Sequence, residues 1–227
     1  MCFSASASFT ASVALVALGV VTVRKARTRA ELPYAWIPVL FGIQQGLEGA
    51  LWMTFPDGAP GWNIALTHAY SFFSHVLWPV YVPLAALAIE PVAARRRVIG
   101  AIAIAGAAVG LYLLAMLVRL PITARVVEHH IFYDSPHFYV RLTMALYLLG
   151  TCASLMVSSH RRVAVFGVAA FISAVAAYAF YAYWFISVWC FFSAVMSVIV
   201  LWHLSANREG QAPAFSAFAS HQTGERS

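Results

Sequence analysis

Side chains that could bind an ion or take part in proton transfer occur in the segment "GIQQGLEGALW", from Gly42 to Trp52. Gln44 lies four residues and Gln45 three residues before Glu48, which puts all three on one face of a helix. The flanking residues are typical of a membrane span, where a charged side chain costs about 2.5–3.5 kcal/mol or more. The sequence therefore predicts either a functional site on this face or a set of polar contacts between helices.

A second polar face lies in the next apolar segment. His68 and His75 are two helical turns apart, and Ser71 lies between them on the same side. The turn sequence "FPDGAPG" separates the two segments, so they predict an antiparallel helix pair in which His68 reaches the depth of Glu48. In any reaction at this site we expect Glu48 and His75 to be the catalytic residues. The predicted ligand-binding residues are Gln44, Gln45, His68, Ser71 and Arg141.

Further potential metal ligands occur in the loop "EHHIFYDSPH". Imidazole and carboxylate groups suit zinc or copper, and Cys2 would add an amine and a thiol if Met1 were removed. The metal site predicted on this basis has the ligands Glu48, His68, His75, His129, His130 and Cys2. The alternative is a loop whose aromatic residues lie at the membrane interface. A haem site is less favoured, because no facing span offers partner histidines.

Composition places the whole chain in the integral membrane class. Of its 227 residues, 62% are hydrophobic and 10% are charged, whereas soluble domains average about 25% charged residues. The net charge of +6 does not indicate nucleic-acid binding, because the basic residues form short clusters between apolar runs. The predicted partners are the lipid bilayer and a small molecule or ion, with homo-oligomerisation left open.

The apolar runs predict an all-α bundle of seven membrane-spanning helices in residues 1–204, followed by a disordered polar tail in 205–227. Basic and non-basic connectors alternate, which predicts the N-terminus outside and the C-terminus inside. Residues 163–204 are too long for one span, so we expect a tight turn near residues 181–183. Pro79 and Pro83 should kink the third span. The predicted spans are 7–23, 34–55, 63–89, 98–118, 138–158, 163–181 and 183–204.

Three functional hypotheses follow from these residues. The favoured one is an outward-facing polar site that binds a small ligand, metal ion or proton for transport or sensing. The second is a metal-dependent hydrolase that acts on a lipid-like substrate, with Glu48 as general base. The third is a structural protein in which Glu48 pairs with Arg141 or His68, while Gly42, Gly46 and Gly49 let helices approach closely.

Several motifs carry a resemblance to a known family. The start "MCFSASASF", then "ELPYAWIPVLFGIQQGLEGALW", "HVLWP" and "EHHIFY" resemble an uncharacterised bacterial family of multi-span membrane proteins. The resemblance implies a multi-pass protein of the bacterial inner membrane. It also implies that Cys2, Gln45, Glu48, His75 and the run Glu128–His130 are important.

A partial similarity to a second group involves "SFFSH", which contains Ser71 and His75. The intramembrane hydrolases that include alkaline ceramidases and adiponectin-receptor-like proteins have Ser-x-x-x-His in one span. Their second signature, His-x-x-x-His near the last span, is absent, because His203 stands alone.

Overall fold

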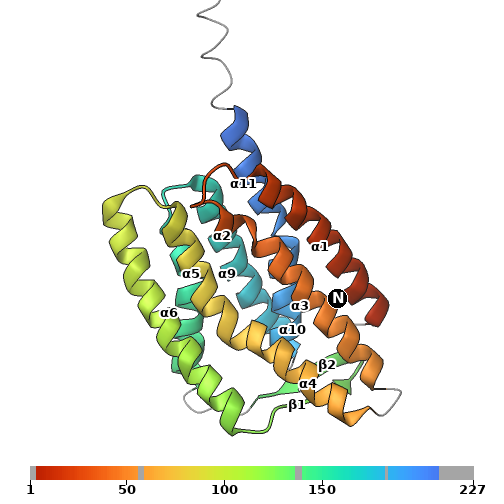
Figure 1. The fold of residues 1–227 in the computed structure, drawn as a ribbon. Helices are drawn as coiled ribbons and strands as arrows, with labels where there is room; N and C mark the ends of the chain where they lie inside the picture. The colour runs from red at the N-terminus through yellow and green to blue at the C-terminus, as the bar shows by residue number, and fades with distance from the viewer. Residues whose placement is uncertain (1–3, 56–58, 136–139, 182–183, 210–227) are drawn as a thin grey trace, which may run out of the picture.

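The computed structural model describes residues 4–55, 59–135, 140–181 and 184–209, which form a helical bundle with one β-hairpin at its end (Figure 1). The helices run alternately in opposite directions along the bundle. In chain order the elements are α1 (Ala5–Lys25), α2 (Leu32–Ala35), α3 (Ile37–Thr54), α4 (Pro60–Ser71), η1 (Phe72–Leu77), α5 (Trp78–Ile89), α6 (Ala93–Arg119), β1 (Thr123–Val127), β2 (His130–Asp134), α7 (Val140–Leu148), η2 (Leu149–Ala153), α8 (Ser154–Met156), α9 (Arg161–Tyr181), α10 (Phe185–Val195) and α11 (Val198–Glu209).

Four of the described helical stretches are long and apolar enough to cross a membrane. Apolar side chains on them face outward, such as Ile104 and Val118, which are 74% and 78% exposed. A contiguous apolar surface of this kind suits lipid rather than water. Helix α3 is not among the four, although it has 18 residues, because its polar residues lower its hydropathy. The four stretches are Ala5–Lys25, Pro60–Ile89, Ala93–Arg119 and Arg161–Phe180.

Among the described residues, the predicted spans largely coincide with helical segments. Helix α9 ends at Tyr181 and α10 begins at Phe185, and residues 182–183 of the predicted turn lie outside the described residues. The sequence did not predict the second break, where α10 gives way to α11 around Met196 and Ser197. The predicted disordered tail lies outside the described residues, except for its first five positions, which continue α11.

Glycines let α1 and α3 pack almost backbone to backbone. A Cβ atom on Gly42 would lie 3.0 Å from the backbone nitrogen of Val16, and one on Gly49 would lie within about 3 Å of the Phe9 ring. The Ser12 hydroxyl donates a 2.7 Å hydrogen bond to the Gly42 carbonyl across this contact. The predicted close approach at these glycines is confirmed, and it fixes the helix that carries the polar residues.

Pro79 produces an irregular helix rather than a simple kink. It lacks a backbone N–H, and the preceding turn widens into the π-helical segment η1. The Ser74 carbonyl, five residues before the proline, instead accepts a hydrogen bond from the Tyr147 hydroxyl. A Cβ on Gly106 would lie 2.1 Å from the Pro79 carbonyl oxygen and one on Gly150 would lie 3.0 Å from it. Three helices therefore meet at Pro79, beside the residues of the predicted site.

The loop before α7 is a β-hairpin, so the prediction of an all-α fold is wrong in this segment. Val127 pairs with His130 across a two-residue turn formed by Glu128 and His129, whose φ angles are 48° and 63°. Positive φ at both central residues is the geometry of a type I′ turn, which matches the twist of paired strands. We call this end of the bundle the hairpin end.

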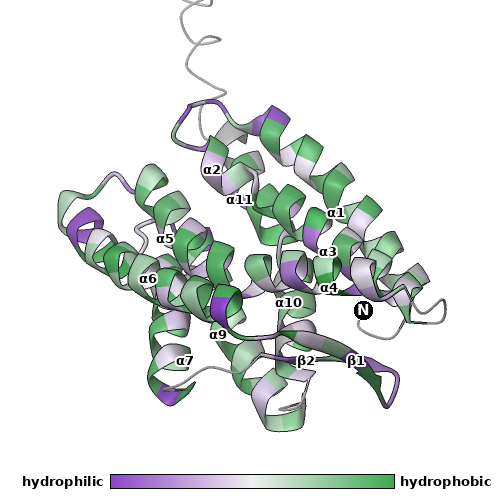
Figure 2. Cartoon of the chain, turned by 60° about the horizontal axis from the view of Figure 1, so that its bottom comes forward, coloured by the Kyte–Doolittle hydropathy of each residue, from purple (hydrophilic) through white to green (hydrophobic). Residues whose placement is uncertain are grey.

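The opposite end, called the basic end, carries Arg24–Lys25, Arg95–Arg97 and Arg161–Arg162. Figure 2 shows hydrophilic residues near the ends of α1 and α6 and in the hairpin, while the helix surfaces between them are mainly hydrophobic. The connector after α5 is fixed by Glu90, whose carboxyl group is 1% exposed. Burial alone would raise the pKa of Glu90, but hydrogen bonds from Ser159, Val92 and Ser158 outweigh it and hold the pKa below 4.5.

Candidate functional site

The polar face of α3 is completely buried. Gln44, Gln45 and Glu48 each have 0% exposure. Their face of α3 is turned toward α10 and α5. The Trp78 indole N–H donates a 2.7 Å hydrogen bond to Gln44 Oε1. Gln44 Nε2 in turn lies 3.2 Å from the Cys190 sulfur. One amide thus holds a tryptophan and a cysteine that are more than 100 residues apart in sequence.

Glu48 makes its contacts with neutral side chains. Ser187 Oγ donates a short hydrogen bond to Glu48 Oε1, and Gln45 Nε2 lies 3.4 Å from Oε2. The pairing of Glu48 with Arg141 or His68, expected for a structural clamp, is therefore wrong. Tyr70 lies beside both the Glu48 carboxyl and the Cys190 thiol.

Two atoms near these contacts have no hydrogen-bond partner among the described residues. They are Gln45 Oε1 and Ser71 Oγ, and both residues are 0% exposed. A buried polar atom without a partner costs about 1–3 kcal/mol, so native structures contain few of them. These atoms mark the cluster as the candidate site.

His75 is held in one tautomer by its surroundings. Its Nδ1 lies 3.1 Å from the Ser71 carbonyl oxygen and 2.8 Å from Ser74 Oγ. A carbonyl can only accept, so Nδ1 carries a proton, and in a neutral imidazole Nε2 is then the acceptor. Nε2 lies 3.0 Å from Ser135 Oγ, just after the hairpin. The ring is thus oriented through both of its nitrogens.

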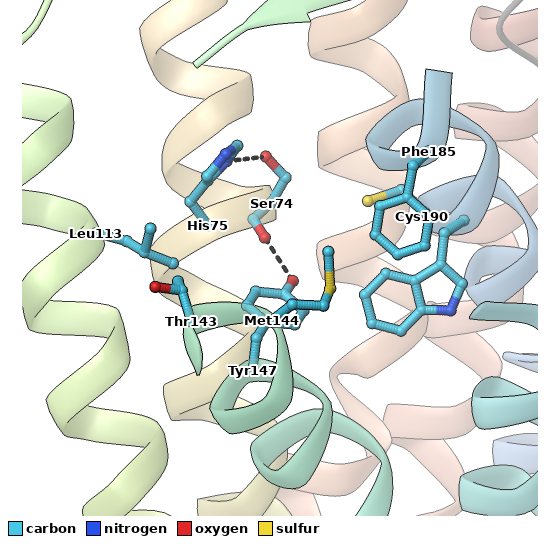
Figure 3. Close-up of a pocket in the computed structure, with 9 residues that line it drawn as sticks. Ser74, His75, Leu113, Thr143, Met144, Tyr147, Phe185 and Cys190 are labelled. Atoms are coloured by element: carbon cyan, nitrogen blue, oxygen red, sulfur yellow. Dashed lines mark hydrogen bonds between the residues drawn. The ribbon is translucent and has the colours of Figure 1, made fainter. Parts of the chain in front are cut away.

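His75 and Cys190 line a common cavity of about 80 Å³ (Figure 3). Tyr147 and Met144 come from α7, Phe185 and Trp189 from α10. One water needs about 10–15 Å³ of such space, so the cavity has room for several waters or a small polar group. A smaller space of about 30 Å³ adjoins it and shares Tyr147, Trp189 and Cys190.

The hairpin covers the site at its end of the bundle. Tyr133 stacks on Tyr70 with ring centroids 4.5 Å apart, and Ile131 is fully buried against Leu51 and Tyr70. The strands at residues 123–134 therefore pack over this end of the cluster that contains Glu48, in a segment where the sequence predicts a loop.

The remaining predicted residues lie apart from this cluster. His68 is partly exposed, and its Nδ1 contacts the Ile64 carbonyl of its own helix at 2.9 Å. His129 is exposed in the hairpin turn, while His130 stacks on Trp184 with centroids 4.8 Å apart. Arg141 is exposed near the start of α7, and Cys2 lies outside the described residues.

The predicted zinc or copper site is not assembled in the part of the chain that the structure describes. No group of three or more His, Cys, Asp and Glu side chains there could hold one ion. The physical reason is that His129 and His130 belong to a β-hairpin with its own register, and His68 makes its hydrogen bond along its own helix. The spacing of these histidines in the sequence predicts a similar depth along the bundle, but it does not determine the direction in which each side chain points.

Sequence reasoning missed the partners that α10 supplies. Neither Cys190 nor Ser187 is among the site residues that the sequence predicts. They are three residues apart, so they share a helical face. The available signal was this pair of polar residues in a run without charges.

Comparison with known proteins gives a family but no activity. No curated protein and no solved structure matches the chain. One family model matches residues 1–215, which agrees with the predicted membership in an uncharacterised family. Because that match covers most of the chain, the protein belongs to the family of unknown function DUF6629.

Proposed function

We propose that the protein spans a membrane seven times, with its N-terminus and the hairpin end outside and the basic end inside. The four long apolar helices support membrane insertion. The shorter segments α2–α3, α7–α8 and α10–α11 run alongside them and supply the remaining spans (Figure 1). The arginine clusters at one end fit the positive-inside rule. The compartment we propose is the bacterial inner membrane.

We further propose that the protein binds a small ligand for transport or sensing, in the cavity lined by His75 and Cys190. The observation that carries this proposal is the buried polar cluster of Gln44, Gln45 and Glu48 behind the cavity wall. In hydrocarbon such groups are expensive, and they commonly mark a pathway or binding site. Gln44 fixes the Cys190 thiol, and Glu48 fixes the α10 turn through Ser187, so both act as positioning residues.

Native mass spectrometry of protein released from its membranes into mild detergent tests this proposal. We expect wild-type protein to retain one bound molecule per chain and His75→Ala to lose it. His68→Ala is the matched control, because His68 lies on α4 outside the cavity, and it should retain the molecule. If wild-type protein carries no bound molecule and His75→Ala is equally stable, the polar cluster only fastens helices together.

A second candidate function, hydrolysis of a lipid-like substrate, rests on the Ser135–His75 contact. The Ser135 hydroxyl lies 3.0 Å from one nitrogen of the His75 imidazole, and the other nitrogen contacts the Ser71 carbonyl. The three groups are thus arranged as a nucleophile, a base and an orienting group. This version needs no metal ion. Labelling of Ser135 by a fluorophosphonate probe, lost in Ser135→Ala and in His75→Ala, would favour it. If the probe does not label Ser135, the hydrolase function is wrong and the binding function remains.

A further inference from the structure

A groove runs along the outer surface of the bundle between α7 and α9. It has a volume of about 480 Å³, and its walls include Ala145 and Leu148 on α7 and Phe171 and Tyr178 on α9. A second hollow of about 410 Å³ shares Ala145, Leu148 and Phe171 and continues to Met156. Arg141 to Met156 corresponds to roughly 22 Å of helix at 1.5 Å per residue. The two hollows thus follow most of the length of this span.

The groove shares part of its wall with the cavity that His75 lines. Met144 and Phe185 line both spaces. On the groove side they adjoin a mainly apolar surface that also includes Arg141, and on the cavity side they adjoin His75, Tyr147 and Cys190 (Figure 3). Both side chains are only partly buried. Met is an adaptable side chain with three rotatable bonds, so a small rotamer change at Met144 would connect the two spaces.

Among the described residues, the side toward the hairpin is packed more extensively. Tyr133 stacks on Tyr70, Ile131 is fully buried, and Ser135 contacts His75 at the end of the hairpin. Opening this side requires the hairpin to leave a buried apolar cluster, whereas opening the groove side requires movement of two side chains. The groove faces the zone that the apolar helices would place in lipid, so the easier route leads from the bilayer.

The chemistry of the cavity selects the polar end of the ligand. Its polar lining comes from Ser74, His75, Thr143, Tyr147 and Cys190. None of the described residues that line it is Asp, Glu, Lys or Arg, and an ionised group buried without a partner is strongly disfavoured. A hydroxyl or amide can use these donors and acceptors, and an alkyl chain suits the groove.

We propose that the ligand is a long-chain amphiphile with a compact uncharged polar end, which reaches the cavity sideways from the bilayer between Met144 and Phe185. The polar end meets His75 and Cys190, and the chain stays in the α7–α9 groove. This inference rests on the proposed binding function, since it names the ligand class and route for the same cavity.

The test uses full-length protein in nanodiscs and a sixteen-carbon alcohol with a photoreactive diazirine beside the hydroxyl. Mass spectrometry of the digested protein locates the labels. In wild type we expect labels on Ser74, His75, Trp189 and Cys190, which line the cavity. Met144→Trp should lower them roughly tenfold or more, as a loss of about 1.4 kcal/mol in binding would. Leu111→Trp is the matched control, because Leu111 is 68% exposed on α6, away from the groove.

A second variant keeps the test sound if Met144→Trp does not fold. Ala145 is exposed in the groove, so Ala145→Phe should fill it from the lipid side without disturbing the interior. It should also reduce the cavity labels. If cavity labelling persists in both folded variants, the lateral route is wrong, while the proposed binding function stands.

The matching sixteen-carbon acid tests the head group. Stronger cavity labelling by the acid than by the alcohol, abolished by Arg141→Gln, would overturn the uncharged head group. Labels spread evenly over all lipid-facing helices, with none in the cavity, would overturn the inference. If wild-type protein also shows no bound molecule in native mass spectrometry, the proposed function fails with it.

Discussion

Two carboxyl groups are equally buried in this protein, yet their surroundings differ. Glu90 at the basic end is 1% exposed and Glu48 near the hairpin end is 0% exposed. Glu90 accepts hydrogen bonds from the backbone N–H groups of Ser159 and Val92, at 2.7 and 3.0 Å, and from the Ser158 hydroxyl at 3.1 Å. It ties the α5–α6 connector to the start of α9.

Glu48 has a different set of neighbours. Ser187 donates one hydrogen bond and Gln45 a long one, Tyr70 lies beside the carboxyl, and Gln45 Oε1 has no partner among the described residues. Its partners are all side chains, whereas Glu90 accepts from two backbone N–H groups. Burial alone therefore does not define a role. Glu90 fastens the fold, and we propose that Glu48 belongs to a binding site.

The largest effect should come from Glu90→Ala, which leaves two backbone N–H groups and a hydroxyl without their acceptor. Hydrogen bonds to charged groups contribute about 1.5–3 kcal/mol each, so we expect a loss of about 3 kcal/mol or more after partial rehydration. Thermal unfolding in detergent, compared with Glu48→Ala, measures it. Equal losses of stability in the two variants would show that the two carboxyls do not differ in their contribution to the fold.

Acid should weaken the same contact, by less than the deletion does. The pKa of Glu90 is lower in the folded protein than its ordinary value of 4.5, so its contribution to stability is fully present above pH 4.5. It declines as pH falls through the lower folded pKa. We expect the wild-type melting temperature to drop below pH 4.5 more steeply than that of Glu90→Gln. Parallel pH profiles would show that another group dominates.

The hairpin turn offers a smaller, stabilising change. Glu128 and His129 both have positive φ, which costs L-residues about 1–2 kcal/mol relative to glycine. Replacing Glu128 by Asn and His129 by Gly should raise stability by about 1 kcal/mol, because this pair favours the type I′ turn. Hydrogen exchange of the strand amides measures the gain. Loss of the bound molecule in this variant would indicate that His129 is a ligand.

The smallest effect on stability should come from Glu48→Gln. A Gln at this position still accepts from Ser187, and a flipped Gln45 amide can accept from the new N–H, so we expect a change within about 1 kcal/mol. Native mass spectrometry should also show unchanged occupancy of the cavity, because the contact with Ser187 that positions the α10 turn is kept. Lost occupancy would show that the bound molecule depends on the carboxyl group of Glu48 itself.

The local pattern of the sequence determined the helices and the buried face of α3. Apolar runs of span length, turn residues and the break at Tyr181 fixed where helices begin and end, and the spacing of Gln44, Gln45 and Glu48 fixed their common face. The small-residue pattern at Gly42 and Gly49 likewise predicted the close contact with α1. These features depend on neighbours within a few turns, which the sequence displays directly.

Tertiary structure alone decided which side chains meet. Gln44 contacts Cys190 and Glu48 contacts Ser187 across more than 100 residues, and the direction in which α10 faces depends on the packing of the whole bundle. The strand pair at residues 123–134 formed where a loop was expected, and it packs over one end of the cluster that contains Glu48. Depth along a helix can be counted from the sequence, but rotation about its axis is set by what it packs against.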